Sequence, residues 1–318
     1  MILAVTWDGE GLGRSGREVL GAATRLGREL GVDVALASLG ADGAAAAEQA
    51  GGHGAARVFV VEGADSAAGA QRAVAALAEL ARELEARVVL LAADEQGGDV
   101  APRLAERLGG TALTHAVALE VADGRPTWVR PVFGGKALAR IAAASEPVVA
   151  TLRRGAFDPA EPGGGPAALE TREAPADDGA VELLGSEVTG EEASLEEAVV
   201  IVSGGGGLGS QEAFSELEEL AGLLGGAVGA SLAAVDAGWA APEQQVGLTG
   251  KAVSPDVYFA FGISGASQHL AGIGGAKAVV AVNTDPDAPI FSAARFGVVM
   301  DSRELLRALI EELRRGGK

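Results

Sequence analysis

Glycine-rich turns and small polar side chains gather in the last third of the chain, and these residues are the best candidates for binding chemistry. An apolar run at residues 198–202 is followed by four consecutive glycines, Gly204 to Gly207, and then by a helical pattern from Gln211. Such an order of strand, glycine turn and helix presents backbone N–H groups and a helix N-terminus to a ligand. Because that terminus carries partial positive charge, it favours an anion such as a pyrophosphate. The pattern therefore predicts a nucleotide-cofactor site that includes Gly206 and Gly207.

Gly204, Gly206 and Gly209 also match the spacing of the dinucleotide-binding fingerprint, although a chance match is expected in a chain with 48 glycines. The fingerprint further requires a carboxylate at the end of the next strand to hold a ribose. That strand leads into Ser231, and no carboxylate follows before Asp236. An ordinary NAD-binding unit is therefore disfavoured.

A second candidate anion site begins at Ser264 and Gly265, which follow a predicted strand and open a predicted helix. The plain alternative is a serine N-cap. His269 lies early in the same helix. It either has a structural role or donates to a carbonyl oxygen, or to the charge that develops on a reduced ring.

Three further polar residues have both a functional and a plain interpretation. Thr249 lies in the polar loop 245–251, and its one donor and two acceptor lone pairs suit a ring nitrogen that changes protonation during redox chemistry; otherwise the loop is only a connection. Asn283 ends a strand at the carboxyl edge, where open α/β sheets bind ligands, or forms an Asx turn before Pro286. Asp301 either caps the last helix or contacts a ribose or adenine.

Composition excludes several classes of protein. The chain has 318 residues, enough for two domains, and its formal charge of 25 − 44 = −19 argues against a nucleic-acid backbone or an anionic membrane surface as partner. It contains no cysteine and three histidines, so neither thiolate ligands nor a multi-histidine metal centre is expected. No apolar run approaches the roughly 20 residues of a membrane span. The first residues read as a strand without a basic leader, so a cytoplasmic location is predicted.

The first half alternates between apolar runs and amphipathic stretches, which predicts a parallel sheet covered by helices on both faces. Strands are expected at residues 2–7, 32–38, 57–61 and 88–91, and helices at 16–30, 41–50, 67–84 and 100–108, the last with Pro102 in its first turn. Residues 113–121, 127–133, 136–141 and 148–152 read as successive strands that extend the sheet in an antiparallel or mixed manner.

Residues 155–192 are rich in Pro, Gly, Ala and acidic residues, a composition typical of a linker, with a possible edge strand at 181–184. We therefore expect an N-terminal domain at 1–193, including a linker at about 155–193, and a C-terminal domain at 194–318. The fold class is α/β throughout. The first domain is predicted to be a sheet of the nucleotide-hydrolase or universal-stress type, and the second a doubly wound sheet. In the second domain we expect strands at 198–202, 227–230, 257–261, 278–282 and 298–300, with helices at 211–224, from 263, and from Asp301 to Arg314.

Five segments of the second domain occur in an order and spacing that resemble a known family. They are VSGGGGLGSQEAF, GASLAAVDAGW, QQVGLTGK, YFAFGISGASQHLAGI and VAVNTDPDAPIF. Together they resemble the FAD-binding domain of the electron transfer flavoprotein α subunit, and GISGASQHLAG and NTDPDAPIF are the most specific. Looser matches, such as AADEQGGDVAPRLAERLG and PVFGGKAL, extend the resemblance through the first half.

The resemblance implies an electron carrier without substrate turnover of its own. Such a protein is a heterodimer with an electron transfer flavoprotein β subunit, with FAD held by the α subunit and AMP expected in β. It accepts electrons from acyl-CoA dehydrogenases and related enzymes and passes them to an electron transfer flavoprotein–quinone oxidoreductase, as in fatty acid β-oxidation.

The resemblance also implies a role for each matching residue. Ser231 and Ser264 approach the pyrophosphate with the backbone from Gly262 through Gly265, Thr249 sits at flavin N5, and His269 lies near the C2 carbonyl. Gln245 and Gln268 contact the ribityl–phosphate region, in a loop that continues through Val246 and Gly247, while Asn283 and Asp301 hold the adenosine end.

The chain departs from the family pattern at four positions. Gly206 and Leu232 stand where the family usually has arginine, Leu248 replaces a glutamine before the threonine, and Thr284 replaces a lysine. Loss of a charge-assisted hydrogen bond predicts a less stable anionic semiquinone. This leaves open a specialised or bifurcating FAD-dependent carrier as an alternative to ordinary transfer.

Two other function classes fit the sequence less well. The first is an NAD- or thiamine-linked enzyme, for which no nucleophile–His–Asp arrangement or catalytic base is evident. The second is a nucleotide-sensing interaction protein built on the first domain, but residues 7–11 do not form a phosphate loop, so a scaffold for the partner subunit is expected instead.

Overall fold

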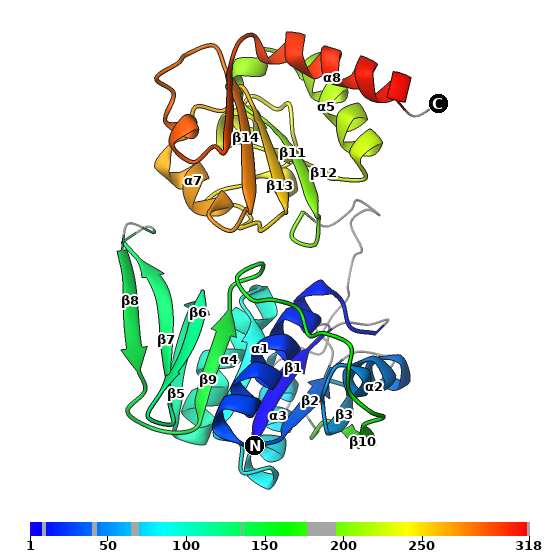
Figure 1. Cartoon of the computed structure of the whole chain (residues 1–318), viewed down its shortest axis with the longest axis vertical. Helices are drawn as coiled ribbons and strands as arrows, with labels where there is room; N and C mark the ends of the chain where they lie inside the picture. Colours follow the sequence, from blue (N-terminus) through cyan, green and yellow to red (C-terminus); the bar gives the residue numbers. More distant parts are fainter. Residues whose placement is uncertain are drawn as a thin grey trace. The chain divides into compact units, whose positions relative to one another are not determined.

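The computed structural model divides the chain into two compact units, Met1–Val188 and Thr189–Lys318, and each is described by itself (Figure 1). The structure describes residues 1–7, 11–39, 43–64, 70–133, 135, 137–176 and 195–316. The possible edge strand at 181–184 lies outside these residues. None of the described helices is both long enough and apolar enough to cross a membrane.

The N-terminal unit is built on a seven-stranded parallel sheet with the strand order β10-β3-β2-β1-β4-β9-β5. From β1 through β5, strands and helices alternate along the chain. The elements are β1 (Ile2–Thr6), α1 (Arg14–Leu30), β2 (Val34–Ser38), α2 (Gly43–Gly52), β3 (Arg57–Glu62), α3 (Ala70–Glu83), β4 (Val88–Ala92), α4 (Glu95–Leu108), β5 (Thr111–Ala116), β9 (Val148–Leu152) and β10 (Ala168–Glu173). The alternation predicted from the sequence is confirmed.

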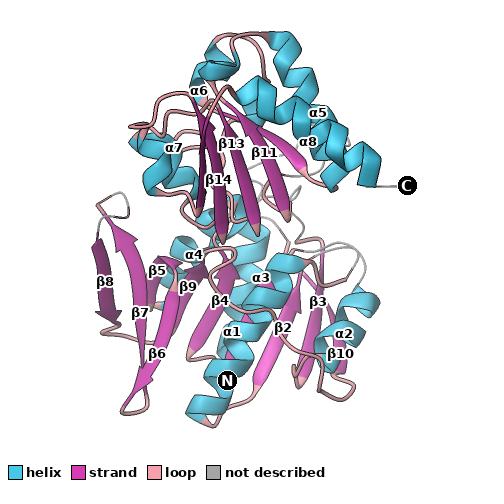
Figure 2. Ribbon diagram, turned by 45° about the horizontal axis from the view of Figure 1, so that its top comes forward, coloured by secondary structure: helices cyan, strands magenta, loops and turns pink. Residues whose placement is uncertain are grey.

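Helices cover both faces of this sheet, as Figure 2 shows. Side chains alternate along each strand, so Ile2 and Ala4 of β1 join the core under α1, while Leu3 and Val5 join the core under α3 and α4. All five residues of β1 are buried. Burial on both faces explains why these strands read as continuous apolar runs.

Helix α4 begins five residues earlier than predicted from the sequence. Asp94 is its N-cap, and the carboxylate accepts a hydrogen bond from the Gly97 amide at 2.7 Å. Pro102 therefore lies inside the helix rather than in its first turn. The carboxylate cap outweighs the poor helix propensity of Gly97 and Gly98.

The sequence predicts that the strands after α4 extend the main sheet together. In the structure they divide between two sheets instead. β5 and β9 join the main sheet in parallel, with β9 between β4 and β5. The three strands between them, β6 (Ala118–Ala122), β7 (Arg125–Val132) and β8 (Ala137–Ala142), form a separate antiparallel sheet. Its buried Trp128 packs with the core under α1, which ties the small sheet to the main one.

The stretch predicted to be a linker contributes to the N-terminal core. Phe157 and Ala160 are buried, and the Ala160 amide donates to the Arg17 carbonyl on α1 at 2.8 Å. Farther along, β10 adds a parallel edge strand to β3, pairing Ala168 through Glu173 with Arg57 through Glu62. Composition alone did not indicate this strand, because most of its residues are exposed and half of them are charged.

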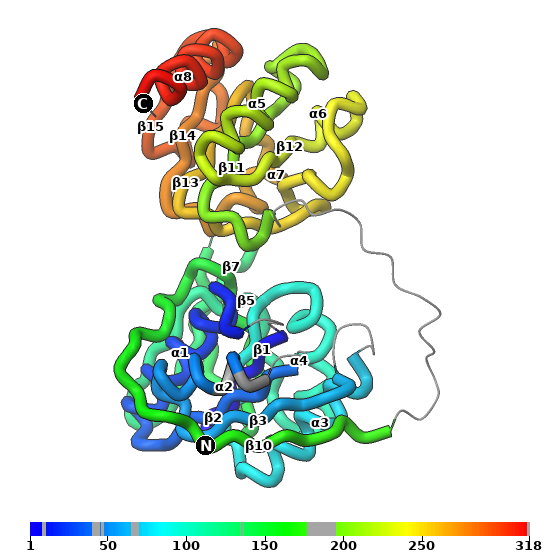
Figure 3. Tube along the Cα trace, turned by 90° about the vertical axis from the view of Figure 1, so that its right-hand side faces the viewer, coloured from blue at the N-terminus to red at the C-terminus, as the bar shows by residue number. Residues whose placement is uncertain are grey.

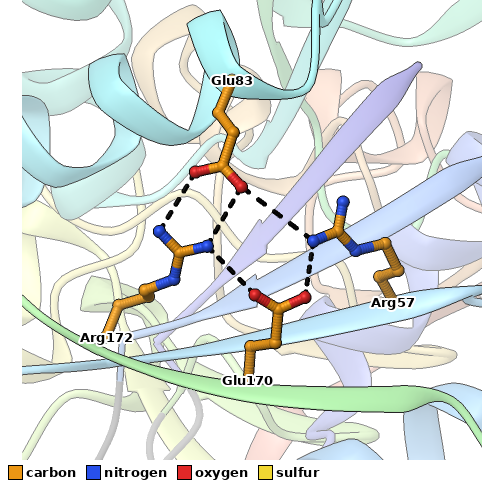
Figure 4. Close-up of polar contacts among 4 residues, drawn as sticks. All are labelled: Arg57, Glu83, Glu170 and Arg172. Atoms are coloured by element: carbon orange, nitrogen blue, oxygen red, sulfur yellow. Dashed lines mark hydrogen bonds and ion pairs between the residues drawn. The ribbon is translucent and has the colours of Figure 1, made fainter.

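Four alternating charges hold β10 in place (Figure 4). Arg172 makes two hydrogen bonds with Glu83 on α3, both 3.0 Å, and a third with Glu170 at 3.0 Å. Arg57 on β3 bonds Glu170 at 2.5 Å, and both guanidinium groups lie over the Phe59 ring, at 4.7 and 5.6 Å. These arginines hold the pKa of Glu170 below its usual range through their hydrogen bonds.

The C-terminal unit is a five-stranded parallel sheet with the order β12-β11-β13-β14-β15. Two of its helices, α5 and α8, lie together on one face (Figure 3), while α7 packs on the other. The elements are β11 (Val200–Gly204), α5 (Gln211–Leu224), β12 (Ala227–Ala230), α6 (Leu232–Asp236), β13 (Val257–Phe261), α7 (Ser267–Ile273), β14 (Ala278–Asn283), β15 (Phe296–Val299) and α8 (Ser302–Gly316).

Sequence expectations for this unit are mostly confirmed. The bounds of α5, β12 and β13 agree with the prediction, and the doubly wound arrangement is present. Three differences matter for the site: α7 begins at Ser267 rather than near Ile263, the short helix α6 follows Ser231, and β15 ends at Val299.

Candidate functional site

The candidate site lies at the carboxyl edge of the C-terminal sheet. Strand order reverses between β11 and β13, because the chain leaves β11 toward β12 on one side and later returns to β13 on the other. Open α/β sheets bind ligands at such a switch point. The loops that follow Gly204 and Phe261 meet there.

Glycines bring these two loops into backbone contact. The Gly207 amide donates to the Gly262 carbonyl at 3.0 Å, and the Gly205 amide donates to the Phe261 carbonyl at 2.9 Å. A Cβ on Gly205 would stand 2.4 Å from the Gly262 carbonyl oxygen. Gly262 itself has φ +63°, which side chains adopt at a cost. Only glycine therefore fits at these positions.

This contact corrects one expectation from the sequence. The amides of Gly205 and Gly207 are not bare, since both donate to protein carbonyls. A short 3-10 turn, Gly206–Leu208, precedes α5, and both of its glycines are exposed. A Cβ on Gly206 would have room, 3.7 Å from the Ala233 Cβ, whereas a Cβ on Gly207 would stand 2.8 Å from the Gly262 Cα. The glycine run shapes the site more than it donates to it.

The loop after β13 has the free donors instead. The carbonyl of Ile263 accepts from the Asn283 side chain at 3.0 Å, and the carbonyl of Ser264 accepts from the Ile290 amide at 3.0 Å. The carbonyls of this loop are thus engaged, whereas the amides of residues 263–266 have no acceptor among the described residues. Successive unpaired amides form an anion-binding surface.

Gly265 is needed to keep that loop in place. Its φ is +85°, and a Cβ there would lie 2.2 Å from the Ile290 amide nitrogen. Ser264 is exposed beside it, but it is not the N-cap of α7, because that position belongs to Ala266. The plain N-cap interpretation of Ser264 is therefore wrong.

Ser231 adds a buried hydroxyl at the end of β12. Its amide donates to the Gly204 carbonyl at 2.9 Å, so it borders the glycine turn. The hydroxyl oxygen is buried and has no hydrogen-bond partner in the described part of the chain. An unsatisfied buried hydroxyl is costly in a folded protein and is typical of a group that completes its bonding with a ligand.

The loop 245–251 folds against the start of α7. Gln245 donates its side-chain amide to the Thr249 hydroxyl at 2.9 Å, and the Leu248 amide donates to the Gln268 carbonyl at 2.8 Å. Gly247, with φ +154°, has its amide bonded to the Lys251 carbonyl. The loop is thus an ordered turn that presents Thr249 to solvent. Val246 is buried in the core and its amide donates to the Ala230 carbonyl at 2.9 Å, so only its carbonyl is left for a ligand.

His269 is buried and bonded to a residue that the sequence analysis did not single out. Its Nε2 lies 3.1 Å from the hydroxyl of Tyr258 on β13, a residue with no exposed surface. Burial lowers the pKa of His269 to about 4; the Val246 backbone opposes this shift, although no hydrogen bond of normal geometry reaches Nδ1. His269 is therefore a neutral imidazole at pH 7, and Nδ1 remains for a ligand.

Asn283 and Asp301 are both engaged within the protein. Asn283 accepts from the Asp285 amide at 3.0 Å while it donates to Ile263, which is the Asx turn foreseen from the sequence. Asp301 accepts from the amides of Arg303 and Glu304, at 2.8 and 3.3 Å, and so caps α8. Each keeps oxygen lone pairs for a further contact.

The predicted residues thus meet along one edge through direct contacts: Gly207 with Gly262, Ser231 with Gly204, Leu248 with Gln268, and Asn283 with Ile263. Asp301 reaches this set through its neighbour Met300, whose amide donates to the Asn283 carbonyl at 3.2 Å. Within the described ranges, no group of three or more His, Asp or Glu residues could hold a metal ion.

Comparison with known proteins identifies the family. A model of the electron transfer flavoprotein domain matches residues 4–177, and a model of the electron transfer flavoprotein FAD-binding domain matches residues 194–274. The chain is 39% identical over 293 residues to the electron transfer flavoprotein subunit alpha of Syntrophomonas wolfei, covering 91% of this chain and 92% of that protein. The chain belongs to the electron transfer flavoprotein α-subunit family.

A second relative agrees with this assignment, whereas a structural comparison adds nothing to it. The α subunit of the electron transfer flavoprotein from Paracoccus denitrificans is 40% identical over 300 residues, with 91% of this chain and 92% of that protein covered. A putative thiamin diphosphate-dependent enzyme from Mycobacterium smegmatis aligns in structure at 13% identity, covering 95% of this chain and 54% of that chain, with a TM-score of 0.23. That likeness is too low to support any argument.

The donor set of the α-subunit chain fits a flavin dinucleotide. Four amides at 263–266, which have no acceptor in the described part of the chain, suit a diphosphate. Two buried polar atoms that also lack partners among the described residues, Ser231 Oγ and His269 Nδ1, lie in the same set of loops. Tyr258 is the functional candidate that sequence reasoning missed. Its signal was available, since it is the single tyrosine of the chain and a buried hydroxyl requires a partner.

Proposed function

We propose that this chain binds FAD in its C-terminal unit and serves as the α subunit of a heterodimeric electron carrier. In this role it receives electrons from acyl-CoA dehydrogenases and related enzymes and passes them to a quinone oxidoreductase. The bound flavin would supply the ring that takes up and releases electrons. The single observation that carries the proposal is the row of amides at 263–266 that have no acceptor among the described residues, bordered by glycines that admit no Cβ.

The residues divide the cofactor among them. The amides of 263–266, with Ser231 and Ser264, hold the diphosphate, and Gln245 and Gln268 hold the ribityl–phosphate region. Thr249 contacts flavin N5 and His269 donates at the C2 carbonyl. Gly206 and Gly207 line the binding site. Gly207 contributes through packing, because its amide already donates to the Gly262 carbonyl. Asn283 and Asp301 bind the adenosine end through their remaining lone pairs.

Diphosphate binding in this site depends on amides more than on cations. Leu232, about half exposed at the start of α6, and Gly206 occupy the positions where the family usually has arginine, and Gly206 lies against the neighbouring Ala233. The absence of arginine at Gly206 and Leu232 favours a second candidate function. This is a specialised or bifurcating carrier whose flavin has an altered reduction potential. The N-terminal unit then acts as a scaffold for the β subunit, in which AMP is expected.

Co-expression with its β subunit tests the proposal. The purified complex, supplied with excess FAD and then gel-filtered, should show a visible flavin band and close to one FAD per heterodimer. Its reduction by an acyl-CoA dehydrogenase with substrate should bleach that band. A complex that stays colourless under these conditions would refute FAD binding, whereas a coloured complex that no dehydrogenase reduces would refute the assigned donors.

A further inference from the structure

The pairing of Tyr258 with His269 restricts which ring nitrogen of the histidine can act. His269 Nε2 and the Tyr258 hydroxyl lie 3.1 Å apart, both side chains are buried, and their rings are tilted by 57° with centroids 6.0 Å apart. Nε2 is thereby engaged. Any ligand of His269 must bond to Nδ1, which makes no hydrogen bond of normal geometry among the described residues, although the Val246 backbone lies close enough to oppose the lowering of the His269 pKa.

The direction of the Tyr258–His269 bond decides what Nδ1 can offer. A neutral imidazole has one donor nitrogen and one acceptor nitrogen, and the bond made by one fixes the role of the other. Burial raises the pKa of Tyr258, partly offset by the buried Ser203 hydroxyl, so the phenol keeps its proton. If the phenol donates to Nε2, the imidazole proton must reside on Nδ1.

We propose that Tyr258 is a positioning residue that holds His269 in the Nδ1–H tautomer, so that a neutral N–H donor faces the flavin. This inference rests on the proposed FAD site. It goes beyond that proposal because it assigns a role to Tyr258 and specifies which nitrogen of His269 donates. The opposite tautomer would present a lone pair to a flavin carbonyl oxygen, which is repulsive.

Nitrogen NMR of the histidine side chains tests the inference without any turnover assay. The full chain has three histidines, His53, His115 and His269, so the three ¹⁵N-labelled imidazoles are readily assigned with His→Gln variants. At pH 7.5, His269 should show a protonated Nδ1 and an unprotonated Nε2, with and without FAD. Observation of a protonated Nε2 in the wild-type chain would overturn the proposal, even if no variant folds.

The Tyr258→Phe variant removes the hydroxyl and retains the ring. We expect the His269 signals to change from one tautomer to a mixture, while those of His115, in the other unit, stay unchanged as an internal control. The competent fraction sets the apparent affinity, so FAD binding by the heterodimer should weaken by about two- to fivefold. The flavin midpoint potential should also shift, a change that lost packing alone would not produce.

Unchanged His269 signals in Tyr258→Phe would contradict the positioning role. The result is separable from the proposed function: a wild-type heterodimer that binds no FAD fails the function, whereas the tautomer is read on the chain alone. Conversely, a coloured heterodimer with His269 in the Nε2–H form retains the function and rejects the inference.

Discussion

The backbones of Gly207 and Gly262 touch, with the Gly207 amide donating to the Gly262 carbonyl at 3.0 Å and a Cβ on Gly207 expected only 2.8 Å from the Gly262 Cα. This contact joins the turn after β11 to the turn after β13 at the switch point of the sheet. It aligns the free amides of 263–266 without the help of a side chain.

Gly262→Ala should strongly destabilise the C-terminal unit. A Cβ there meets the Gly207 backbone at 2.8 Å, and φ is +63°. The left-handed conformation costs about 1–2 kcal/mol and the overpacking about 1–3 kcal/mol more. Urea unfolding of the full chain and FAD retention by the heterodimer measure the effect.

Gly209→Ala is the matched control for that substitution. Gly209 also has a positive φ, +75°, but, apart from its chain neighbours, none of the described residues has an atom within 4 Å of its Cβ position. It should show only the conformational cost, about 1–2 kcal/mol, and should retain FAD. Equal losses in the two variants would show that the junction with Gly207 contributes nothing beyond backbone strain.

Gly206→Arg should fold normally and bind FAD more tightly. Gly206 is exposed, and among the described residues its Cβ would meet the Ala233 Cβ alone, at 3.7 Å. A charge-assisted hydrogen bond to the diphosphate contributes about 1.5–3 kcal/mol, which is at least about tenfold in affinity. Equilibrium dialysis of FAD at two salt concentrations measures it, with Gly206→Gln as the neutral control. Equal affinity for both variants would place the diphosphate away from Gly206.

Leu232→Arg should raise the flavin midpoint potential. Leu232 is 49% exposed at the start of α6 and stands where the family usually has an arginine, so an arginine restored there is expected to stabilise the reduced, negatively charged flavin. Partial exposure weakens the effect. We therefore expect the potential of the one-electron couple to rise by about 60 mV, which corresponds to the lower end of the free energy of a charge-assisted hydrogen bond. Spectroelectrochemical titration of the heterodimer checks this value against Leu232→Met, which should stay at the wild-type potential.

His269 should make folding stability depend on pH in the acidic range. Burial lowers its pKa to about 4 from 6.5, so between these values the unfolded chain binds a proton that the folded chain does not. Stability is full above pH 6.5 and falls as the pH drops, by up to about 2 kcal/mol between pH 6.5 and 5.

Urea unfolding of the FAD-free chain from pH 7.5 to 5 measures this dependence, and His269→Gln should flatten it. Burial and the nearby Arg130 and Arg153 also lower the pKa of His115, so that residue contributes in the same direction. His115→Gln therefore serves as the comparison that separates the two histidines. An unaltered slope in His269→Gln would contradict the assignment.

Arg172→Gln should loosen β10 without unfolding the N-terminal unit. Arg172 bridges Glu83 on α3 and Glu170, so its loss leaves the edge strand with fewer attachments. Hydrogen exchange of the β10 amides should accelerate several-fold, more so at low salt, because exposed pairs are screened by ions. Arg103→Gln, which removes an isolated pair with Asp99 on α4, should leave β10 exchange unchanged.

Local sequence signals determined much of this protein. Apolar runs bounded by turns placed β12 and β13 at their observed limits, amphipathic spacing placed α5, and the single carboxylate at Asp301 predicted the cap of α8. The order of strand and glycine turn also predicted the edge of the sheet at which the candidate site lies. These features depend on residues that are close together in the chain. They can therefore be predicted without knowledge of the tertiary structure.

Tertiary structure alone decided which groups of the site are free. The Gly205 and Gly207 amides looked available in the sequence, but the carbonyls that take them belong to residues more than fifty positions later. The same holds for β10, which pairs with β3 across a separation of about a hundred residues, and for the hydroxyl of Tyr258, which faces His269 only because α7 folds back over β13. Hydrogen-bond partners are chosen by proximity in space, and proximity in space between distant segments is set by packing rather than by local pattern.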